Sequence, residues 1–124
     1  MNMTVTFDSS AWIEYFSGSE LGMIVKEYVD SSVSIYTPSI GLLEIKNKYQ
    51  REGHKWKSRI EFIMERSIII DVDADVALAG AEVRNKDGLH TIDALIYAAS
   101  QSVHSKIITK DHHFEKLKNV ILLE

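Results

Sequence analysis

The sequence has no cysteine, one proline and six glycines among its 124 residues. The absence of cysteine excludes disulfides, thiol nucleophiles and cysteine-ligated zinc or iron–sulfur centres. Few glycines and prolines, with no repeat or low-complexity stretch, predict short loops and no flexible linker. No apolar run is as long as a membrane span, and residues 1–8 lack the features of a secretion signal. We therefore expect a single domain over residues 1–124 that is cytoplasmic and makes no membrane contact.

The net charge of −4 hides an uneven distribution of charged side chains. Residues 46–66 contain seven of the fourteen basic residues and three glutamates, so this stretch carries +4 and the rest of the chain −8. Such a stretch can hold a polyanion, and Lys48, Arg51 and Lys55 are the candidates for contact with a nucleic-acid backbone. The simpler interpretation is a solvated helix face whose lysines pair with nearby glutamates. Trp56 is expected to anchor this region to the core rather than to stack on a base.

Apolar spacing predicts strands and helices that alternate along the chain. Strands are expected over residues 3–7, 33–37, 67–71, 106–109 and 120–123. Helices are expected over residues 9–16, 20–29, 38–51, 54–65, 73–88 and 91–102, with a short helix after Asp111. This alternation predicts an α/β fold in which a parallel or mostly parallel sheet has helices on both faces. Ligands of such sheets bind beyond the carboxyl ends of the strands.

Polar residues at the expected helix starts predict how these helices are capped. Residues 17–20, Ser-Gly-Ser-Glu, have the form of a capping box. Thr37 precedes Pro38, which predicts threonine as the N-cap and proline as the first helical residue. Asp73 and Thr91 are expected to open the next two long helices.

Two aspartates follow expected strands at corresponding positions. Asp8 comes directly after the first strand, and Asp111 follows the fourth. Each one alone is most simply the N-cap of the following helix. Because the carboxyl ends of parallel strands meet at one edge of the sheet, the two together also suggest a site.

Two further acidic residues lie on expected helices. Glu44 shares a stripe with Ile40, Leu43 and Asn47, which has the spacing of a buried face. A buried carboxylate needs a cation, a raised pKa or a metal ion, whereas a position at the edge of the face would let it reach water. Asp93 lies in the first turn of a nearly all-apolar helix. There it either only interacts favourably with the helix dipole or also faces the strand ends.

Four carboxylates gathered at one edge of the sheet would repel one another by roughly 3 kcal/mol for each pair about 5 Å apart. A hard divalent cation removes this repulsion, and oxygen ligands suit Mg²⁺ or Mn²⁺. Without these four charges the net charge of the chain is zero. The pattern therefore favours metal-assisted phosphate chemistry, in which the cation activates water.

These motifs, taken together, resemble those of the PIN-domain nucleases. The matching segments run in order along the chain as Asp8-Ser-Ser, Glu44, Asp93-Ala-Leu-Ile-Tyr-Ala-Ala and Ile-Ile-Thr109-Lys-Asp111-His-His-Phe114. The resemblance covers essentially the whole chain, and the small size is similar to that of the VapC-type toxins of toxin–antitoxin pairs. It implies a three-layer α/β/α fold with five parallel strands in the order 3-2-1-4-5.

The resemblance also implies an activity, Mg²⁺- or Mn²⁺-dependent endonucleolytic cleavage of RNA. The implied catalytic residues and metal ligands are Asp8, Glu44, Asp93 and Asp111. Ser9 and the hydroxyl of Thr109 would support them. A homodimer and a cognate antitoxin that blocks the site are implied as partners. Many relatives have a further acidic residue where this chain has His113, which leaves the number of metal ions open.

Other interpretations remain open at this point. A catalytically silent RNA- or protein-binding module and an RNA-processing nuclease without an antitoxin would share the same motifs. A receiver domain would explain Asp71 at the end of the third strand, but the last strand ends in Leu123 and Glu124 without the lysine it needs. A metal site built on His112 and His113 is not expected, since adjacent residues of a helix do not face each other.

Overall fold

The computed structural model describes residues 3–124, which form five parallel strands and six α-helices. The strands are β1 (Thr4–Phe7), β2 (Ser34–Pro38), β3 (Ile68–Ile70), β4 (Lys106–Thr109) and β5 (Val120–Leu122). Their order across the sheet is β3-β2-β1-β4-β5, which confirms the expected fold class and strand order. A receiver domain, with the order 2-1-3-4-5, is thereby excluded.

The central strands are buried on both faces of the sheet. Val5 and Phe7 of β1 join one hydrophobic cluster, whereas Thr6 between them faces the other side and is equally buried. Strand β4 divides in the same way, with Ile108 in the first cluster and Ile107 in the second. This alternation is the two-residue period of a strand between two helical layers.

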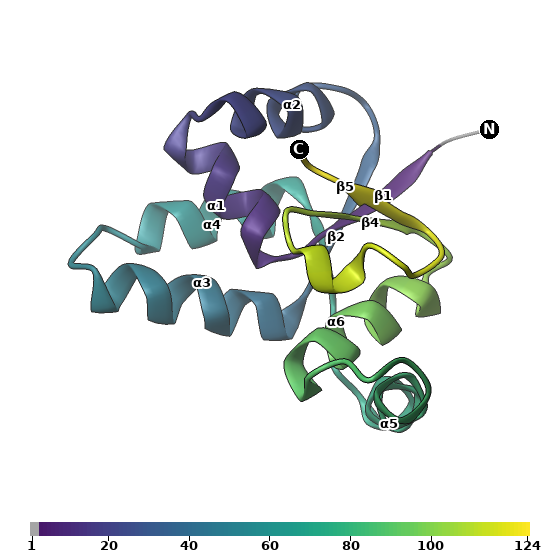
Figure 1. The fold of residues 1–124 in the computed structure, drawn as a ribbon. Helices are drawn as coiled ribbons and strands as arrows, with labels where there is room; N and C mark the ends of the chain where they lie inside the picture. Colours follow the sequence, from purple (N-terminus) through teal and green to yellow (C-terminus); the bar gives the residue numbers. More distant parts are fainter. Residues whose placement is uncertain (1–2) are drawn as a thin grey trace.

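The helices form one layer on each face of the sheet (Figure 1). The helices are α1 (Ser9–Ser17), α2 (Glu20–Val29), α3 (Ser39–Arg51), α4 (Lys57–Arg66), α5 (Ala74–Asp87) and α6 (Thr91–Ser102). Helices α1–α4 pack on the cluster that contains Trp12 and Ile45, and α5 and α6 cover the opposite face. A short 3₁₀ helix, η1 (His112–Phe114), connects β4 to β5. No helix in the described part of the chain is long and apolar enough to cross a membrane.

Three predicted helix caps, those of α2, α6 and α3, are wrong by one or two residues. Helix α2 is capped by Ser19, whose hydroxyl accepts from the backbone N–H of Gly22, so residues 17–20 do not form a capping box. Helix α6 has His90 at its N-cap, and Thr91 is its first residue. Asp73 caps α5 as predicted.

Thr37 remains in strand β2, and Pro38 is the N-cap of α3 instead of its first residue. The reason lies in the Thr37 hydroxyl, which is fully buried. It accepts a hydrogen bond from the Trp12 indole at 3.0 Å and bonds the Ser67 hydroxyl at 2.7 Å. These contacts tie β2 to α1 and to the start of β3, so the hydroxyl is not available to cap a helix.

The basic helix α4 begins at Lys57, three residues later than predicted. Gly53, with a φ of 73°, ends the preceding helix, and residues 54–56 form the connection. Trp56 is half-buried against the main core cluster, as expected, and the Lys46 ammonium lies 4.2 Å from its ring centroid. The connection is therefore held by packing of Trp56 rather than by another helical turn.

Candidate functional site

Asp8 lies at the carboxyl end of β1 and also caps helix α1. One carboxylate oxygen accepts from the Ala11 backbone N–H at 3.0 Å and from the Ser10 hydroxyl at 2.7 Å. The other accepts from the Thr109 hydroxyl. Strand register explains this contact, because Phe7 pairs with Ile108 and the next residues are Asp8 and Thr109. The capping and site interpretations of Asp8 are therefore compatible.

Burial dominates the electrostatics of Asp8. Its side chain is only 4% exposed, and burial raises the pKa of its carboxyl from 3.8 to about 6. The hydrogen bonds from Thr109, Ser10 and Ala11 oppose this change, and the nearby carboxylate of Asp111 adds to it. A negative charge at Asp8 is thus costly without a cation.

Glu44 projects from α3 towards the same edge of the sheet. Its Oε1 accepts a hydrogen bond from the Ser9 hydroxyl at 3.1 Å. Burial raises the pKa of its carboxyl, and the charges of Asp8, Asp93 and Asp111 raise it further. The pKa of Glu44 is therefore affected by all three of the other acidic residues proposed from the sequence.

The predicted buried stripe around Glu44 is wrong in detail. Leu43 is 60% exposed and Asn47 is also exposed, whereas the buried face of α3 contains Gly41, Ile45 and Tyr49. Glu44 is half-buried at the border of that face. Helices α1 and α4 cover the Ile45 side of α3, which leaves Glu44 at the border of the buried face.

Asp93 and Asp111 approach each other from different elements. Asp93 lies in the first turn of α6, and Asp111 follows β4 and caps η1 through a 2.8 Å bond from the His113 backbone N–H. The His113 Nδ1 lies 3.5 Å from Asp93 Oδ2 and 3.3 Å from Asp111 Oδ1. One ligand atom from each of the three residues fits within 4.8 Å of the others. Burial and the Asp111 charge raise the pKa of Asp93, while His113 and His90 oppose this.

Sequence reasoning noted that His113 stands where many relatives have an acidic residue, but it did not predict that the imidazole lies between Asp93 and Asp111. The signal that could have placed His113 was Asp111, which a sequence reader can expect to cap the following short helix. Asp111 receives the backbone N–H two residues further on, and this turn brings the residue at that position back to the carboxylate. The imidazole of His112 contacts Glu115 instead.

The donor set fits a divalent cation. Within residues 3–124, no lysine or arginine nitrogen forms a salt bridge with any of the four carboxylates. Four carboxylates and one imidazole offer oxygen and nitrogen ligands of the kind that Mg²⁺, Mn²⁺ and related ions take. A cation here would offset both the burial and the mutual repulsion that raise these pKa values.

The hydroxyls of Ser9 and Thr109 donate hydrogen bonds to two of these carboxylates. Ser9 donates to Glu44, and Thr109 donates to Asp8 while accepting from the Asp111 backbone N–H at 2.9 Å. Ser10, which the sequence analysis left without a role, donates to Asp8 and accepts from the Lys110 backbone N–H. These bonds fix the orientation of the Asp8 and Glu44 carboxylates.

The three basic candidates divide into two groups. Lys48 lines a hollow beside the acidic cluster, together with Ser10, Lys110 and Asp111. Its ammonium also pairs with Glu52 at 2.7 Å. Arg51 is exposed at the end of α3, and Lys55 lines a separate hollow at the turn between α3 and α4.

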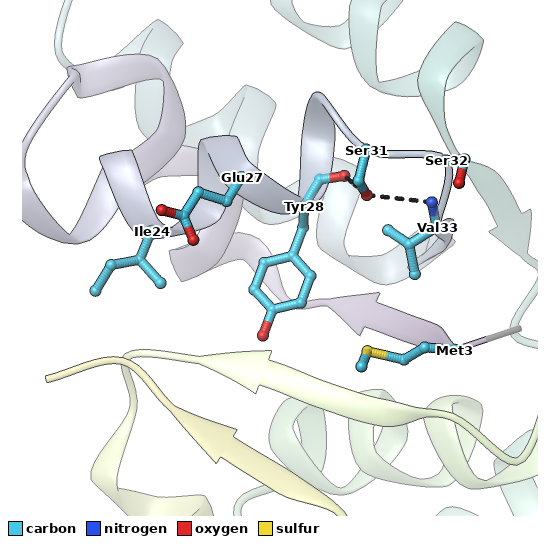
Figure 2. A pocket seen from close by; sticks show the side chains of 7 residues that line it. All are labelled: Met3, Ile24, Glu27, Tyr28, Ser31, Ser32 and Val33. Atoms are coloured by element: carbon cyan, nitrogen blue, oxygen red, sulfur yellow. Dashed lines mark hydrogen bonds between the residues drawn. The ribbon is translucent and has the colours of Figure 1, made fainter.

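Another hollow lies at the opposite edge of the sheet, where the strands begin. Its lining residues are Met3, Ile24, Glu27, Tyr28, Ser31, Ser32 and Val33 (Figure 2). The Ser31 hydroxyl accepts from the Val33 backbone N–H at 3.1 Å, which closes the loop after α2. The four carboxylates lie at the other edge, so this hollow is separate from the candidate site.

Comparisons with known proteins agree with this architecture. A chain of a toxin–antitoxin complex from Klebsiella pneumoniae has a TM-score of 0.83 and 21% identity, over 97% of this chain and 98% of that one. A chain of VapBC2 from Rickettsia felis, bound to a promoter DNA fragment, has a TM-score of 0.73 and 20% identity, over 97% of both chains. Mycobacterium tuberculosis VapC20, described as a sarcin–ricin loop cleaving toxin, has a TM-score of 0.74 and 18% identity, over 97% and 99%.

Identities of this size show a shared fold. No curated protein sequence matches the chain. The sequence profile of the PIN domain, in contrast, matches residues 5–120, which include all four carboxylates and both supporting hydroxyls. The chain therefore belongs to the PIN-domain family.

Proposed function

We propose that this chain is a divalent-metal-dependent endoribonuclease and the toxin of a VapBC-like toxin–antitoxin pair. The observation that carries the proposal is the group formed by Asp93, Asp111 and His113, in which one ligand atom of each residue lies within 4.8 Å of the others. Asp8 and Glu44 are proposed to complete the site, because the charges of Asp8, Asp93 and Asp111 all raise the pKa of Glu44. Three of the four carboxylates have raised pKa values, and no lysine or arginine among residues 3–124 pairs with them. Burial and mutual repulsion disfavour the charged forms of these groups, and a cation offsets both effects; Mg²⁺ or Mn²⁺ is the proposed cofactor.

The proposed roles follow from position and burial. Asp93 and Asp111, the more accessible pair, would hold the cation at the surface of the site. Asp8 is more deeply buried and would contribute a ligand on the inner side of the site. Its carboxylate is oriented by hydrogen bonds from Thr109 and Ser10. Glu44, oriented by Ser9, would complete the set from the side of α3. A divalent ion bound there supplies Lewis-acid activation of water and neutralises phosphate charge.

RNA is the proposed substrate, and two observations support it. The related VapC20 is described as cleaving the sarcin–ricin loop. In this chain, Lys48 and Lys110 line the same hollow as Asp111, and basic side chains there can bind phosphates. The two ammonium groups pair with Glu52 and Glu14, respectively. The VapBC relatives support an antitoxin partner, while the homodimer rests on resemblance alone.

The activity is tested by incubating the tag-free protein with total RNA and sequencing the new ends. We expect cleavage at a few sites with Mn²⁺ or Mg²⁺ and none with chelator. Asp93→Asn should abolish cleavage, whereas Asp75→Asn, an exposed acid in the first turn of α5, should retain it. A protein that binds Mn²⁺ but cleaves no RNA would instead be a silent binding module, and cleavage that persists in Asp93→Asn would contradict the proposed site.

A further inference from the structure

His113 is placed to do more than balance the charge of its neighbours. Its Nδ1 lies between two carboxylate oxygens from different elements, at 3.5 Å from Asp93 and 3.3 Å from Asp111. The backbone of His113 is fixed by the bond from its own N–H to Asp111 Oδ1 at 2.8 Å. The His113 side chain is 62% exposed, and its ring lies edge-on to the ring of His90, with 5.9 Å between the ring centroids.

The distances match those between atoms that share one ion. Oxygen and nitrogen ligands lie about 2.1 Å from Mg²⁺ or a first-row transition ion. Two such ligands are therefore about 3.0 Å apart at a right angle and about 3.4 Å apart at a tetrahedral angle. The contacts of the His113 nitrogen with both oxygens fall close to this range.

We propose that His113 supplies an imidazole nitrogen to the cation held by Asp93 and Asp111, and that this nitrogen makes the site select Mn²⁺ and Co²⁺ over Mg²⁺. Imidazole suits transition ions, whereas Mg²⁺ takes oxygen ligands and is held weakly by nitrogen. This proposal rests on the proposed metal site, but it concerns which ion binds there and which residue decides it.

The competing role for His113 is that of a counter-charge, and it predicts the opposite effect of a substitution. An imidazolium between two carboxylates competes with an incoming cation, so its removal would strengthen metal binding. A ligating imidazole contributes a bond, so its removal would weaken the binding of transition ions. The sign of the change in affinity therefore separates the two roles.

The experiment measures Mn²⁺, Co²⁺ and Mg²⁺ affinities by calorimetry on tag-free protein, at a pH well above the ordinary imidazole pKa. The variants are His113→Asn, which removes the ligand, and His113→Asp, which replaces it with an oxygen ligand. The matched control is His112→Asn, because His112 is adjacent and equally exposed, at 62%, but contacts Glu115. Pulsed electron paramagnetic resonance of bound Mn²⁺ reports imidazole nitrogen coordination directly.

We expect His113→Asn to weaken Mn²⁺ and Co²⁺ binding roughly tenfold or more and Mg²⁺ binding much less. His113→Asp should bind Mg²⁺ at least as well as the wild type and lose the preference for Co²⁺. The nitrogen signal should be present in the wild type and in His112→Asn and absent from both His113 variants.

Two results would overturn the proposal, and they differ in what else they affect. If the wild type binds metal but His113→Asn leaves the Mn²⁺-to-Mg²⁺ ratio and the spectrum unchanged, or strengthens binding, only the role of His113 fails. If the wild type binds none of the three ions, the metal-dependent function fails with it. Circular dichroism of each variant confirms that a change in affinity is not a loss of folding.

Discussion

The hydroxyl of Thr109 donates a hydrogen bond to the carboxylate of Asp8, across 101 residues of sequence. Both side chains are buried, at 0% and 4% exposure, and they stand at neighbouring strand ends. The bond supports the charged form of a carboxylate whose pKa burial raises. It therefore links the stability of the sheet centre to the electrostatics of the candidate site.

Replacing Thr109 by valine keeps the shape of the side chain and removes this bond, together with the bond that the hydroxyl accepts from the Asp111 backbone N–H. Because hydrogen bonds to charged groups are stronger than neutral ones, we expect a loss of about 2 kcal/mol in the free energy of unfolding at pH 8. The loss should be smaller at pH 4, where Asp8 is protonated. The control is Thr37→Val, whose hydroxyl bonds only the neutral Trp12 and Ser67, so its cost should not vary with pH. Urea unfolding at the two pH values measures both variants, and equal pH dependence would contradict this role.

The raised pKa of Asp8 predicts how the stability of the metal-free protein depends on pH. The folded state holds the Asp8 proton more tightly than the unfolded chain, since its pKa is about 6 against 3.8. The stabilisation is complete below pH 3.8 and is lost as the pH rises through 6. Relative to Asp8→Asn, which stays neutral, the wild type should lose roughly 3 kcal/mol between those limits. Unfolding in chelator measures this difference, and parallel curves for the two proteins would refute it.

Glu44 and Glu52 lie on the same helix, and neutralising them should have opposite effects. Burial and three acidic neighbours raise the pKa of Glu44, so Glu44→Gln should raise the melting temperature of metal-free protein while weakening Mn²⁺ binding. Lys48 lowers the pKa of Glu52, so Glu52→Gln should lower the melting temperature slightly and leave Mn²⁺ binding unchanged. Differential scanning calorimetry distinguishes these cases. A fall in melting temperature for Glu44→Gln would show that its charge is already compensated.

The basic residues on and after α3 should contribute to RNA binding through phosphate contacts. In an Asp93→Asn background, which prevents cleavage, replacing Lys48, Arg51 and Lys55 by glutamine should weaken binding and flatten its salt dependence. The slope of log affinity against log salt should fall by about 0.7 for each lost contact with single-stranded RNA. Glutamine at Lys116 and Lys118, both exposed between η1 and β5, is the matched control. An unchanged slope in the triple variant would exclude this surface.

The sequence predicted the elements well because their signals are local. Alternating apolar residues such as Val5 and Phe7 identify a buried strand, and Asp73 identifies a helix start. The cap at Thr37 was mispredicted because tertiary contacts, which local sequence does not reveal, decide whether its hydroxyl is free to cap. The Thr37 hydroxyl forms hydrogen bonds with Trp12 and Ser67, which are distant in the sequence and follow from no local pattern.

Candidate members of the site could be proposed from the sequence, but their geometry could not. Strand-end positions and the family resemblance identified Asp8 and Asp111, and the register of β1 with β4 then placed Thr109 beside Asp8. The helical stripe assigned to Glu44 was wrong, because the direction of a helix face depends on what packs against it. The approach of His113 to Asp93 depends on a turn formed by the Asp111 cap, which no spacing rule had considered.

The central claim is that the four carboxylates form one mutually repelling, metal-binding cluster. Thermal melts with and without Mn²⁺, on the wild type, Asp93→Asn and Asp75→Asn, test it most directly, since a ligand that binds only the folded state raises the melting temperature. We predict that Mn²⁺ stabilises the wild type and Asp75→Asn. Asp93→Asn should be more stable than the wild type without metal and gain less from it. If millimolar Mn²⁺ leaves all three melting temperatures unchanged, the carboxylates do not form a metal site.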